Sequence, residues 1–254
     1  MPESHVIGII PARFASTRFP GKPLVMIAGK TMIQRVFQQA RQSACLHRVI
    51  VATDDQRIVD QVKQFGGDAV MTSSRHASGT DRCMEAVSHL QDAEPSLSVD
   101  IVINIQGDEP FLNPAQIDQV AALFRRPEVS IATLAKRITD ADELKNSNAV
   151  KVVFNHHKRV LTFSRTVIPY QRNISRQDWI NHYPYYKHMG IYGYRLPVLK
   201  EITSLPVSPL EAAESLEQLR WLENGYDIYI DITDNESVAI DTPDDLLKLS
   251  NIIT

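Results

Sequence analysis

The sequence lacks the features that mark several common protein classes. Only two cysteines, Cys45 and Cys83, occur among its 254 residues, too few for a disulfide framework or a cysteine-rich zinc site. No apolar run approaches the length of a membrane-spanning helix, and the N-terminus carries no basic segment before an apolar run. We therefore expect a reduced, cytoplasmic protein that does not enter the membrane.

Neither sign of charge dominates the chain. The 27 lysines and arginines and the 30 aspartates and glutamates leave a net charge of −3. This balance does not favour nucleic acid or an anionic membrane surface as a partner, so any anion must be bound by a local cluster of cations. The hydrophobic content of 43% can form a large core, as one α/β domain or as one domain that carries a lobe.

Both standard glycine motifs for phosphate binding are also absent. The sequence contains neither the Walker pattern nor the dinucleotide pattern G-x-G-x-x-G. Instead, a basic loop with Arg13, Arg18 and Lys22 follows the first apolar segment and contains Pro20 and Gly21. Three cations in a loop that proline stiffens and glycine lets turn sharply suit a polyanion such as a triphosphate. Taken alone, the stretch fits an ordinary basic surface loop equally well.

The first half of the chain alternates short apolar segments with amphipathic ones. The expected strands lie at 6–10, 49–52, 69–71 and 99–105, and the expected helices begin near residues 31, 56, 80 and 114. Near-continuous apolar strands that alternate with helices predict a parallel sheet covered on both faces. Ligands of such a sheet should lie at the carboxyl ends of its strands, where polar loops follow.

The pattern changes from about residue 130. Strand-like segments at 130–138, 149–154, 160–163 and 189–194 have little helix between them, which favours antiparallel pairing. We interpret 130–207 as a second lobe or a dimer arm. The expected elements after it are one long helix from Ser208 through Glu223, a strand at 228–232, a last strand ending at Ile240-Asp241 and a terminal helix from Thr242.

Two aspartates, Asp108 and Asp241, each directly follow an apolar, strand-like segment. Side chains at the ends of such strands can project into one crevice. Mg²⁺ is commonly held by one or two carboxylates together with water and substrate phosphates. The pair therefore predicts a magnesium site facing a triphosphate. The alternative for each residue is a turn former or a helix-start residue.

Seven short motifs carry a resemblance to a known family. They are Pro11-Ala12-Arg13…Ser16-Thr17-Arg18…Pro20-Gly21-Lys22, Ser78-Gly79-Thr80-Asp81-Arg82, Gln106-Gly107-Asp108-Glu109-Pro110, Phe163-Ser164-Arg165, His188…Gly190-Ile191-Tyr192…Tyr194-Arg195, Leu216-Glu217-Gln218-Leu219-Arg220 and Asp241-Thr242-Pro243. Each motif is weak alone. Together, and in this order, they closely resemble the 3-deoxy-manno-octulosonate cytidylyltransferases, or CMP-Kdo synthetases, from about residue 6 to 246.

The resemblance implies an α/β fold like that of the nucleotide-diphospho-sugar transferases, with a mostly parallel central sheet flanked by helices and a smaller mixed or antiparallel lobe. Residues 1–254 would form one nucleotidyltransferase domain, in which 130–207 is an inserted lobe for sugar binding and dimerisation. The implied reaction activates 3-deoxy-D-manno-octulosonate (Kdo) with CTP and Mg²⁺ to give CMP-Kdo and pyrophosphate for lipopolysaccharide biosynthesis. The anomeric hydroxyl would attack the α-phosphate of CTP, and the protein would be a homodimer.

The resemblance also implies roles for individual residues. The nucleotide would be held by Ala12, Arg13, Arg18, Lys22, Ser78 and Gly79, the last two near the cytosine. The catalytic residues would be Arg13, Lys22, Asp108 and Asp241, of which the two aspartates hold Mg²⁺. The sugar site would comprise Gln106, Arg165, His188, Glu217 and Gln218. In that site the fork of Arg165 matches the carboxylate of a sugar acid.

Several alternatives remain open at this stage. The acceptor can be 8-amino-Kdo or another sugar acid. CMP-sialate synthetase is close in chemistry, but the strings at 216–220 and 241–243 argue against it. A non-catalytic nucleotide-binding regulator on the same fold is an alternative of another class, which loss of Lys22 or of a metal aspartate would have indicated. Without the resemblance, His188 would be interpreted as a buried strand histidine, and Glu217 as part of a solvated helix face.

Overall fold

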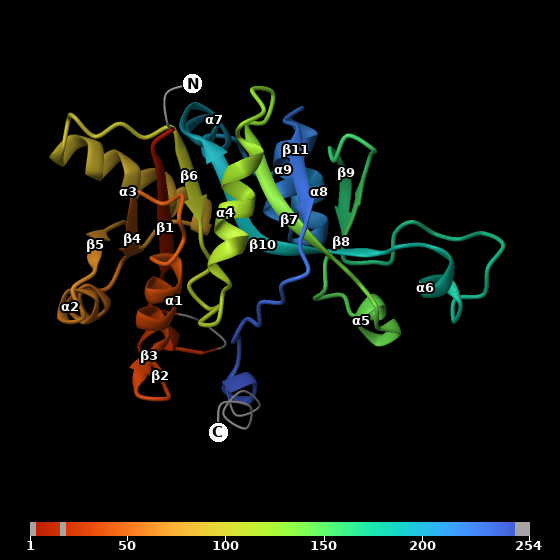
Figure 1. Cartoon of the computed structure of the whole chain (residues 1–254), viewed down its shortest axis with the longest axis horizontal. Coiled ribbons are helices and arrows are strands. Elements are labelled where there is room, and N and C mark those ends of the chain that lie inside the picture. The colour runs from red at the N-terminus through yellow and green to blue at the C-terminus, as the bar shows by residue number, and fades with distance from the viewer. Residues whose placement is uncertain (1–3, 16–18, 247–254) are drawn as a thin grey trace.

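The computed structural model describes residues 4–15 and 19–246, which fold around one nine-stranded sheet (Figure 1). The strand order is β11-β7-β10-β6-β1-β4-β5, with β8 paired to β10 and β9 to β8. These strands are β1 (Val6–Ala12), β4 (Arg48–Thr53), β5 (Asp68–Met71), β6 (Ile101–Asn104), β7 (Ile131–Arg137), β8 (Lys151–Phe154), β9 (Val160–Ser164), β10 (Tyr186–Arg195) and β11 (Ile228–Ile232). A separate small hairpin is formed by β2 (Met26–Ile27) and β3 (Lys30–Thr31).

The helices of the described residues connect and cover these strands. They are the short 3₁₀ helix η1 (Lys22–Leu24), α1 (Met32–Ala40), α2 (Gln56–Gln64), α3 (Gly79–Ala93), α4 (Pro114–Leu123), α5 (Ala141–Lys145), α6 (Trp179–His182), α7 (Leu196–Ile202), α8 (Pro209–Glu214) and α9 (Glu217–Glu223). Side chains of Thr31, Asp55 and Asn113 cap α1, α2 and α4 by accepting backbone N–H bonds. The helix starts predicted for the first half of the chain are confirmed.

The pairing of the strands changes along the sheet. β1 lies between β4 and β6 and is parallel to both, and β5 is parallel to β4. β10 runs antiparallel to β6 and β7, and β11 is again parallel to β7. The parallel sheet predicted for the first half and the antiparallel pairing predicted from residue 130 are both confirmed.

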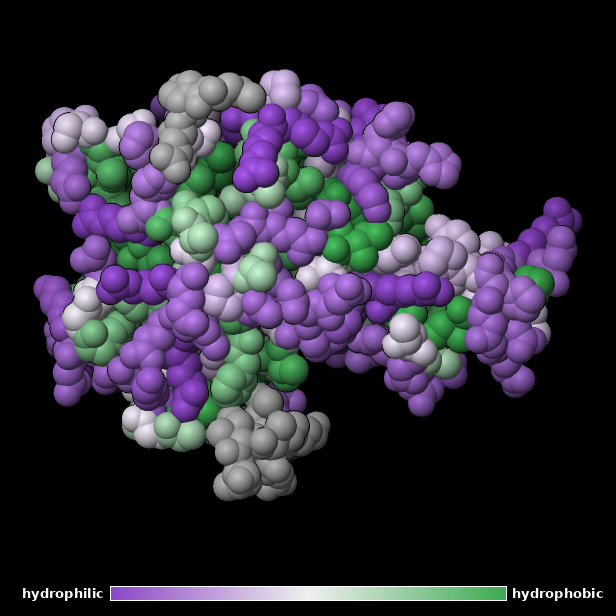
Figure 2. Space-filling model, viewed as in Figure 1, coloured by the Kyte–Doolittle hydropathy of each residue, from purple (hydrophilic) through white to green (hydrophobic). Residues whose placement is uncertain are grey.

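Apolar residues fill the space on both faces of the sheet. α1, α2 and α4 pack on one side through residues such as Val36 and Ile117. α3, α7 and α9 pack on the other through residues such as Val87 and Trp221. On the face shown in Figure 2, hydrophilic residues surround small apolar patches, as expected for helices that bury only one stripe. No helix within the described ranges is long and apolar enough to cross a membrane.

The predicted lobe at 130–207 is only partly separate from the main sheet. β7 and β10 belong to this range, yet they pair with each other within the main sheet, between β11 and β6. The segment between them carries α5, the β8–β9 hairpin, which is joined to the sheet through β10, and α6, which extends away from the body in Figure 1. A role for this segment in sugar binding and dimerisation stays a prediction.

The single long helix predicted from Ser208 through Glu223 is wrong. The chain forms α8 and α9 instead, separated at Ser215, whose backbone is left-handed with φ 51°. Sequence alone favours one helix because no glycine or proline follows Pro209 in this stretch. The break is stabilised from outside, since the Arg165 guanidinium donates to the carbonyl oxygens of Glu214 (2.6 Å) and Ser215 (3.2 Å).

The last strand predicted to end at Ile240-Asp241 is also wrong. Residues 233–241 run without a strand ladder, and the Ile240 N–H donates to the carbonyl oxygen of Asp108 at 2.9 Å. The segment is mostly polar, so a sheet position would bury charged groups. Ile240 is its buried anchor, packed against Ile27 and Met32. The helix predicted from Thr242 is present at 243–246, and its continuation lies outside the described residues.

Candidate active site

The basic loop after β1 folds back toward the sheet. Gly21 has a left-handed backbone, with φ 72°, and its N–H donates to the carbonyl oxygen of Phe14 at 2.9 Å. This turn begins η1 at Lys22 and directs the chain back under the end of β1. Arg18, the helper cation implied by the resemblance, lies outside the described residues.

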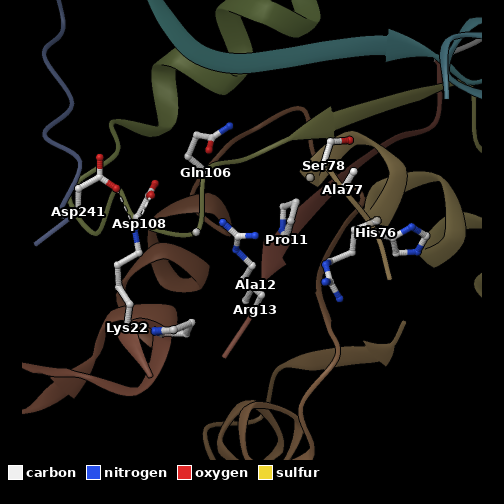
Figure 3. Close-up of a pocket in the computed structure, with 14 residues that line it drawn as sticks. Pro11, Ala12, Arg13, Lys22, His76, Ala77, Ser78, Gln106, Asp108 and Asp241 are labelled. Atoms are coloured by element: carbon white, nitrogen blue, oxygen red, sulfur yellow. Dashed lines mark hydrogen bonds and ion pairs between the residues drawn. The ribbon is translucent and has the colours of Figure 1, made fainter. Parts of the chain in front are cut away.

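A first pocket opens at the carboxyl ends of β1 and β6. Its walls include the predicted residues Ala12, Arg13, Lys22, Ser78, Gly79, Gln106, Asp108 and Asp241. In Figure 3, Ala12 and Arg13 lie between the two aspartates on one side and Ser78 and His76 on the other. The polar loops that follow the strands therefore meet at one edge of the sheet, as predicted.

Lys22 and the two predicted metal aspartates form one cluster in this pocket. The Lys22 ammonium nitrogen lies 2.7 Å from Oδ2 of Asp108 and 3.2 Å from Oδ1 of Asp241. Lys22 and Asp241 are 219 positions apart in the sequence, and the fold brings them together because the backbone bond from Ile240 to Asp108 joins the two acidic segments. Both carboxylates can thus reach one cation placed between them (Figure 3).

Close packing of backbones shapes the floor between β1 and β6. A Cβ atom at Gly107 would lie 2.6 Å from the carbonyl oxygen of Pro11, closer than real contacts allow. Gly107 therefore lets the Asp108 loop approach the end of β1. This approach brings Asp108 next to the basic loop that carries Lys22.

The N-terminus of α3 forms another wall of the first pocket. The Ser78 hydroxyl accepts from the Asp81 N–H at 3.1 Å, and Asp81 accepts from the Ser78 N–H at 3.2 Å. This reciprocal capping box fixes Ser78 and Gly79 at the start of a 15-residue helix. Such a helix start presents partial positive charge, which is compatible with a nucleotide beside it.

A second pocket adjoins the first and shares Pro11, Gly79 and Gln106 with it. It brings together four of the predicted sugar-site residues, Gln106, His188, Glu217 and Gln218. The Gln106 amide donates to the carbonyl oxygen of Gly190 at 2.7 Å. The register of the β7–β10 pair shifts between Met189 and Tyr192, which interrupts the regular strand pairing at Gly190. The Gln106 side chain bonds the Gly190 carbonyl at this interruption.

His188 is held as a neutral ring on β10. Its imidazole packs against the rings of Phe163 and Tyr192, and this burial lowers the pKa of His188 to about 3. Nε2 of His188 lies 3.0 Å from the Thr133 hydroxyl, which also lies 2.7 Å from the carbonyl oxygen of Ile191. If Thr133 gives its one proton to that carbonyl, Nε2 carries the imidazole proton and Nδ1 is left as an acceptor.

Glu217 lies at the start of α9, beyond the break at Ser215. Its carboxylate accepts from the Thr80 hydroxyl at 2.9 Å. Burial raises the pKa of Glu217, and hydrogen bonds from the Thr80 and Ser78 hydroxyls oppose that rise. The helix break therefore turns Glu217 and the buried Gln218 into the second pocket rather than onto a solvated helix face.

The residues of the first pocket fit a magnesium ion. Two carboxylates already share one cationic partner there, and hard oxygen ligands are those that Mg²⁺ prefers. Within the described residues, no group of three or more His, Cys, Asp or Glu side chains could hold a metal ion. A pair of aspartates that relies on substrate phosphates and water for its other ligands is what Mg²⁺ usually needs.

Comparison with known proteins agrees with this geometry. The sequence pattern of the family described as Cytidylyltransferase matches residues 7–230. A 3-deoxy-manno-octulosonate cytidylyltransferase from Bacteroides thetaiotaomicron is 56% identical over 244 residues, which cover 94% of each chain. The chain belongs to the 3-deoxy-manno-octulosonate cytidylyltransferase family. It is therefore a nucleotidyltransferase by family, as the seven motifs predict.

Solved structures support the same fold. A CMP:2-keto-3-deoxy-manno-octonic acid synthetase complexed with CTP superimposes with a TM-score of 0.89 at 42% identity, covering 98% of both chains. A 4-diphosphocytidyl-2C-methyl-D-erythritol synthase from Anaerococcus prevotii, at 10% identity and a TM-score of 0.60, shares the fold alone. The α/β cytidylyltransferase fold predicted from the sequence is confirmed.

Arg165 is the one described residue of the predicted set that neither pocket contains. Its guanidinium donates to the carbonyl oxygens of Ser147, Glu214 and Ser215, and so braces the turn between α8 and α9. This turn places Glu217 in the second pocket. A direct bond from Arg165 to the carboxylate of a sugar acid stays a prediction.

Several pocket residues of this cytidylyltransferase family member received no role from the sequence, Thr80 among them. His76 and Arg82 line the first pocket, and Asn104 and Tyr192 line the second. The buried Arg82 donates to the Thr72 hydroxyl and to the Asp54 carboxylate. Arg82 and Tyr192 belong to the quoted motifs, and Asn104 lies two residues before one. The sequence therefore marked these positions by their place in or near the motifs, but it did not show which contacts their side chains make.

Proposed function

We propose that this chain transfers the cytidylyl group of CTP to Kdo, giving CMP-Kdo and pyrophosphate. The observation that carries the proposal is the pair of adjoining pockets that share Pro11, Gly79 and Gln106. One contains cations and two carboxylates, and the other contains two amides, a neutral imidazole and the single carboxylate of Glu217. Two such pockets with one common wall suit a triphosphate and a polyhydroxylated acceptor whose reacting atoms must meet.

In the proposed reaction the anomeric oxygen of Kdo forms a bond to the α-phosphorus of CTP. The bond between that phosphorus and the bridging oxygen to the β-phosphate breaks, pyrophosphate leaves, and the hydroxyl proton passes to solvent. Positioning and charge neutralisation are the main contributions of a protein to such a displacement. Arg13 and Lys22 would bind the β- and γ-phosphates and stabilise the charge that develops on pyrophosphate.

Asp108 and Asp241 would hold Mg²⁺ in the first pocket. When bound there, Mg²⁺ neutralises phosphate charge and polarises the oxygens it contacts. Lys22, which contacts both carboxylates, would then turn its ammonium toward the phosphates.

The second pocket would bind the sugar acid. The Gln106 and Gln218 amides, the neutral imidazole of His188 and the Glu217 carboxylate offer both donors and acceptors to hydroxyl groups. Arg165, at the edge of this region, would pair with the carboxylate of the acceptor. This pairing requires the guanidinium to exchange at least one of its carbonyl partners for the ligand.

Pyrophosphate release tests the proposal. The purified protein is incubated with CTP and Mg²⁺ and, in separate reactions, with Kdo, 8-amino-Kdo or sialic acid. We expect release with Kdo and none when Mg²⁺ is chelated. Release only with 8-amino-Kdo or only with sialic acid would redirect the acceptor, and no release with any acid would favour a nucleotide-binding regulator.

We also propose that the protein is a homodimer, with the segment between β7 and β10 as the contact region. This segment extends from the body and exposes the large apolar side chains of Leu161 and Tyr170. Light scattering during gel filtration would give about twice the chain mass of 28.6 kDa for a dimer. A single-chain mass across the concentration range would contradict it.

A further inference from the structure

The start of α3 connects the two pockets. Ser78 lines the first pocket, Gly79 lines both, and Thr80 lines the second. Thr80 is 2% exposed, and its hydroxyl donates to Oε2 of Glu217 at 2.9 Å. The two residues are 137 positions apart, so this bond is a purely tertiary contact between α3 and the start of α9.

Thr80 has a rigid position from which to make this bond. The capping box between Ser78 and Asp81 fixes the first turn of α3 on either side of it. Its buried side chain leaves little room for other rotamers, and a β-branched side chain is stiff at its first torsion. Glu217 begins the short helix α9, two residues after the left-handed residue Ser215.

We propose that Thr80 is a positioning residue that orients the Glu217 carboxylate toward the acceptor in the second pocket. This inference rests on the proposed function, since it assigns Glu217 to the sugar. Thr80 and the Ser78 hydroxyl both donate to the carboxylate from the start of α3, and the carboxylate oxygens keep further lone pairs that can accept from an acceptor hydroxyl. The same helix turn presents Ser78 and Gly79 to the nucleotide, so one element aligns both substrates.

The test compares Thr80→Val, which removes the hydroxyl at nearly constant volume, with Thr80→Ser, which retains it. Steady-state pyrophosphate release gives KM for Kdo, KM for CTP and kcat. We expect Thr80→Val to raise KM for Kdo about tenfold, as loss of a hydrogen bond to a charged group would, and to change KM for CTP less than about threefold. Thr80→Ser should remain within about threefold of the wild type for Kdo.

A double-mutant cycle separates positioning from general loss of packing. If Thr80 acts through Glu217, then Thr80→Val should have little further effect on KM for Kdo in a Glu217→Ala background, in which the acceptor of the Thr80 hydrogen bond is gone. Thr203→Val is the matched control, because that hydroxyl bonds only carbonyl oxygens of its own helix α7. If Thr80→Val does not fold, Thr80→Ala replaces it in the same cycle.

The outcomes are distinct. An unchanged KM for Kdo in Thr80→Val, equal losses in the valine and serine variants, or additive effects with Glu217→Ala would each overturn the role of Thr80. Absence of pyrophosphate release by the wild-type protein would instead overturn the proposed function. Thermal unfolding of each variant identifies a loss of activity that comes from loss of the fold.

Discussion

The two pockets share one wall but differ in the side chains that they present to a ligand. In the first pocket, the two aspartates come from loops and remain in contact with solvent, with 24% of the Asp108 and 37% of the Asp241 side chain exposed. In the second, His188 is kept neutral by burial, and Asn104 and Tyr192 are buried. The nucleotide side is therefore arranged for charge, and the acceptor side for shape and hydrogen bonding.

This difference follows from where each pocket lies in the fold. The first pocket lies beyond the carboxyl ends of parallel strands, where loops are free to carry polar residues. The second lies beside β10, whose side chains are enclosed by α9 and the β8–β9 hairpin. Charge can be neutralised by a mobile ion and water, whereas recognition of several hydroxyls requires fixed partners.

The largest effect is expected from removing a charge of the acidic pair. Asp108→Asn and Asp241→Asn should each lower kcat by at least about a hundredfold, because a carboxylate ligand of Mg²⁺ is lost. Pyrophosphate release at saturating CTP and Kdo measures the effect. Asp244→Asn, a change of the same kind at an exposed position nearby, is the control. Near-full turnover in either variant would remove that residue from the metal site.

Lys22→Met should have the next largest effect. Loss of the ammonium group should lower kcat/KM for CTP by about thirtyfold, the range of a charge-assisted contact to phosphate. KM for Kdo should change little, since Lys22 lines only the first pocket. Lys30→Met, which removes an exposed lysine bonded to Gln38, is the control. A parallel rise in KM for Kdo would contradict the separation of the two pockets.

The neutral ring in the second pocket predicts a pH dependence of stability. An unfolded histidine takes up a proton near pH 6.5, whereas native His188, with a pKa of about 3, does not. Below pH 6.5 the unfolded state therefore binds more protons, and the free energy of unfolding falls as the pH falls toward 3. At pH 5 this loss is about 2 kcal/mol.

Urea denaturation without ligands at pH 7 and pH 5 measures this loss. The wild-type protein should lose about 2 kcal/mol more than His188→Gln between the two values, because glutamine does not titrate. His182→Gln, at an exposed position in α6, should behave like the wild type. Equal losses in the wild type and His188→Gln would show that His188 is protonated in the native state.

The first pocket was predictable from the sequence because its residues follow strands. Apolar segments at 6–10 and 99–105 indicate two strands, and Lys22 and Asp108 are close to their ends in the chain. Asp241 lies beside Asp108 as predicted, although the strand expected directly before it is absent. The backbone bond from Ile240 to Asp108 and the packing of Ile240 against Ile27 and Met32 bring it there.

The second pocket was less predictable because tertiary contacts shape it. Glu217 enters it only because α8 ends at Ser215, and the residue that stabilises this break is Arg165, about 50 positions earlier in the chain. Local propensity contains no sign of such a contact. The neutral state of His188 depends equally on distant rings, Phe163 and Tyr192, that no local spacing places beside it.

Arg165→Gln has the smallest expected effect on the kinetics. It tests whether the positive charge of Arg165 pairs with the carboxylate of the acceptor in the second pocket. If Arg165 pairs with the carboxylate of Kdo, the variant should raise KM for Kdo about tenfold, with kcat and KM for CTP nearly unchanged. Arg159→Gln is the control. It removes an exposed arginine that lies in the turn of the β8–β9 hairpin and is paired with Asp227.

The position of Arg165 against the α8–α9 turn makes a second measurement necessary. A variant that only loosens this turn would also displace Glu217, so KM alone does not identify the cause. Kdo analogues in which the carboxylate is replaced by a neutral amide separate the two cases. The wild type should bind the amide more weakly than Kdo, and Arg165→Gln should bind both equally if the guanidinium contacts the carboxylate. If the variant keeps the full preference for the acid, Arg165 acts only as a brace, and the second pocket recognises its ligand without a cation from this residue.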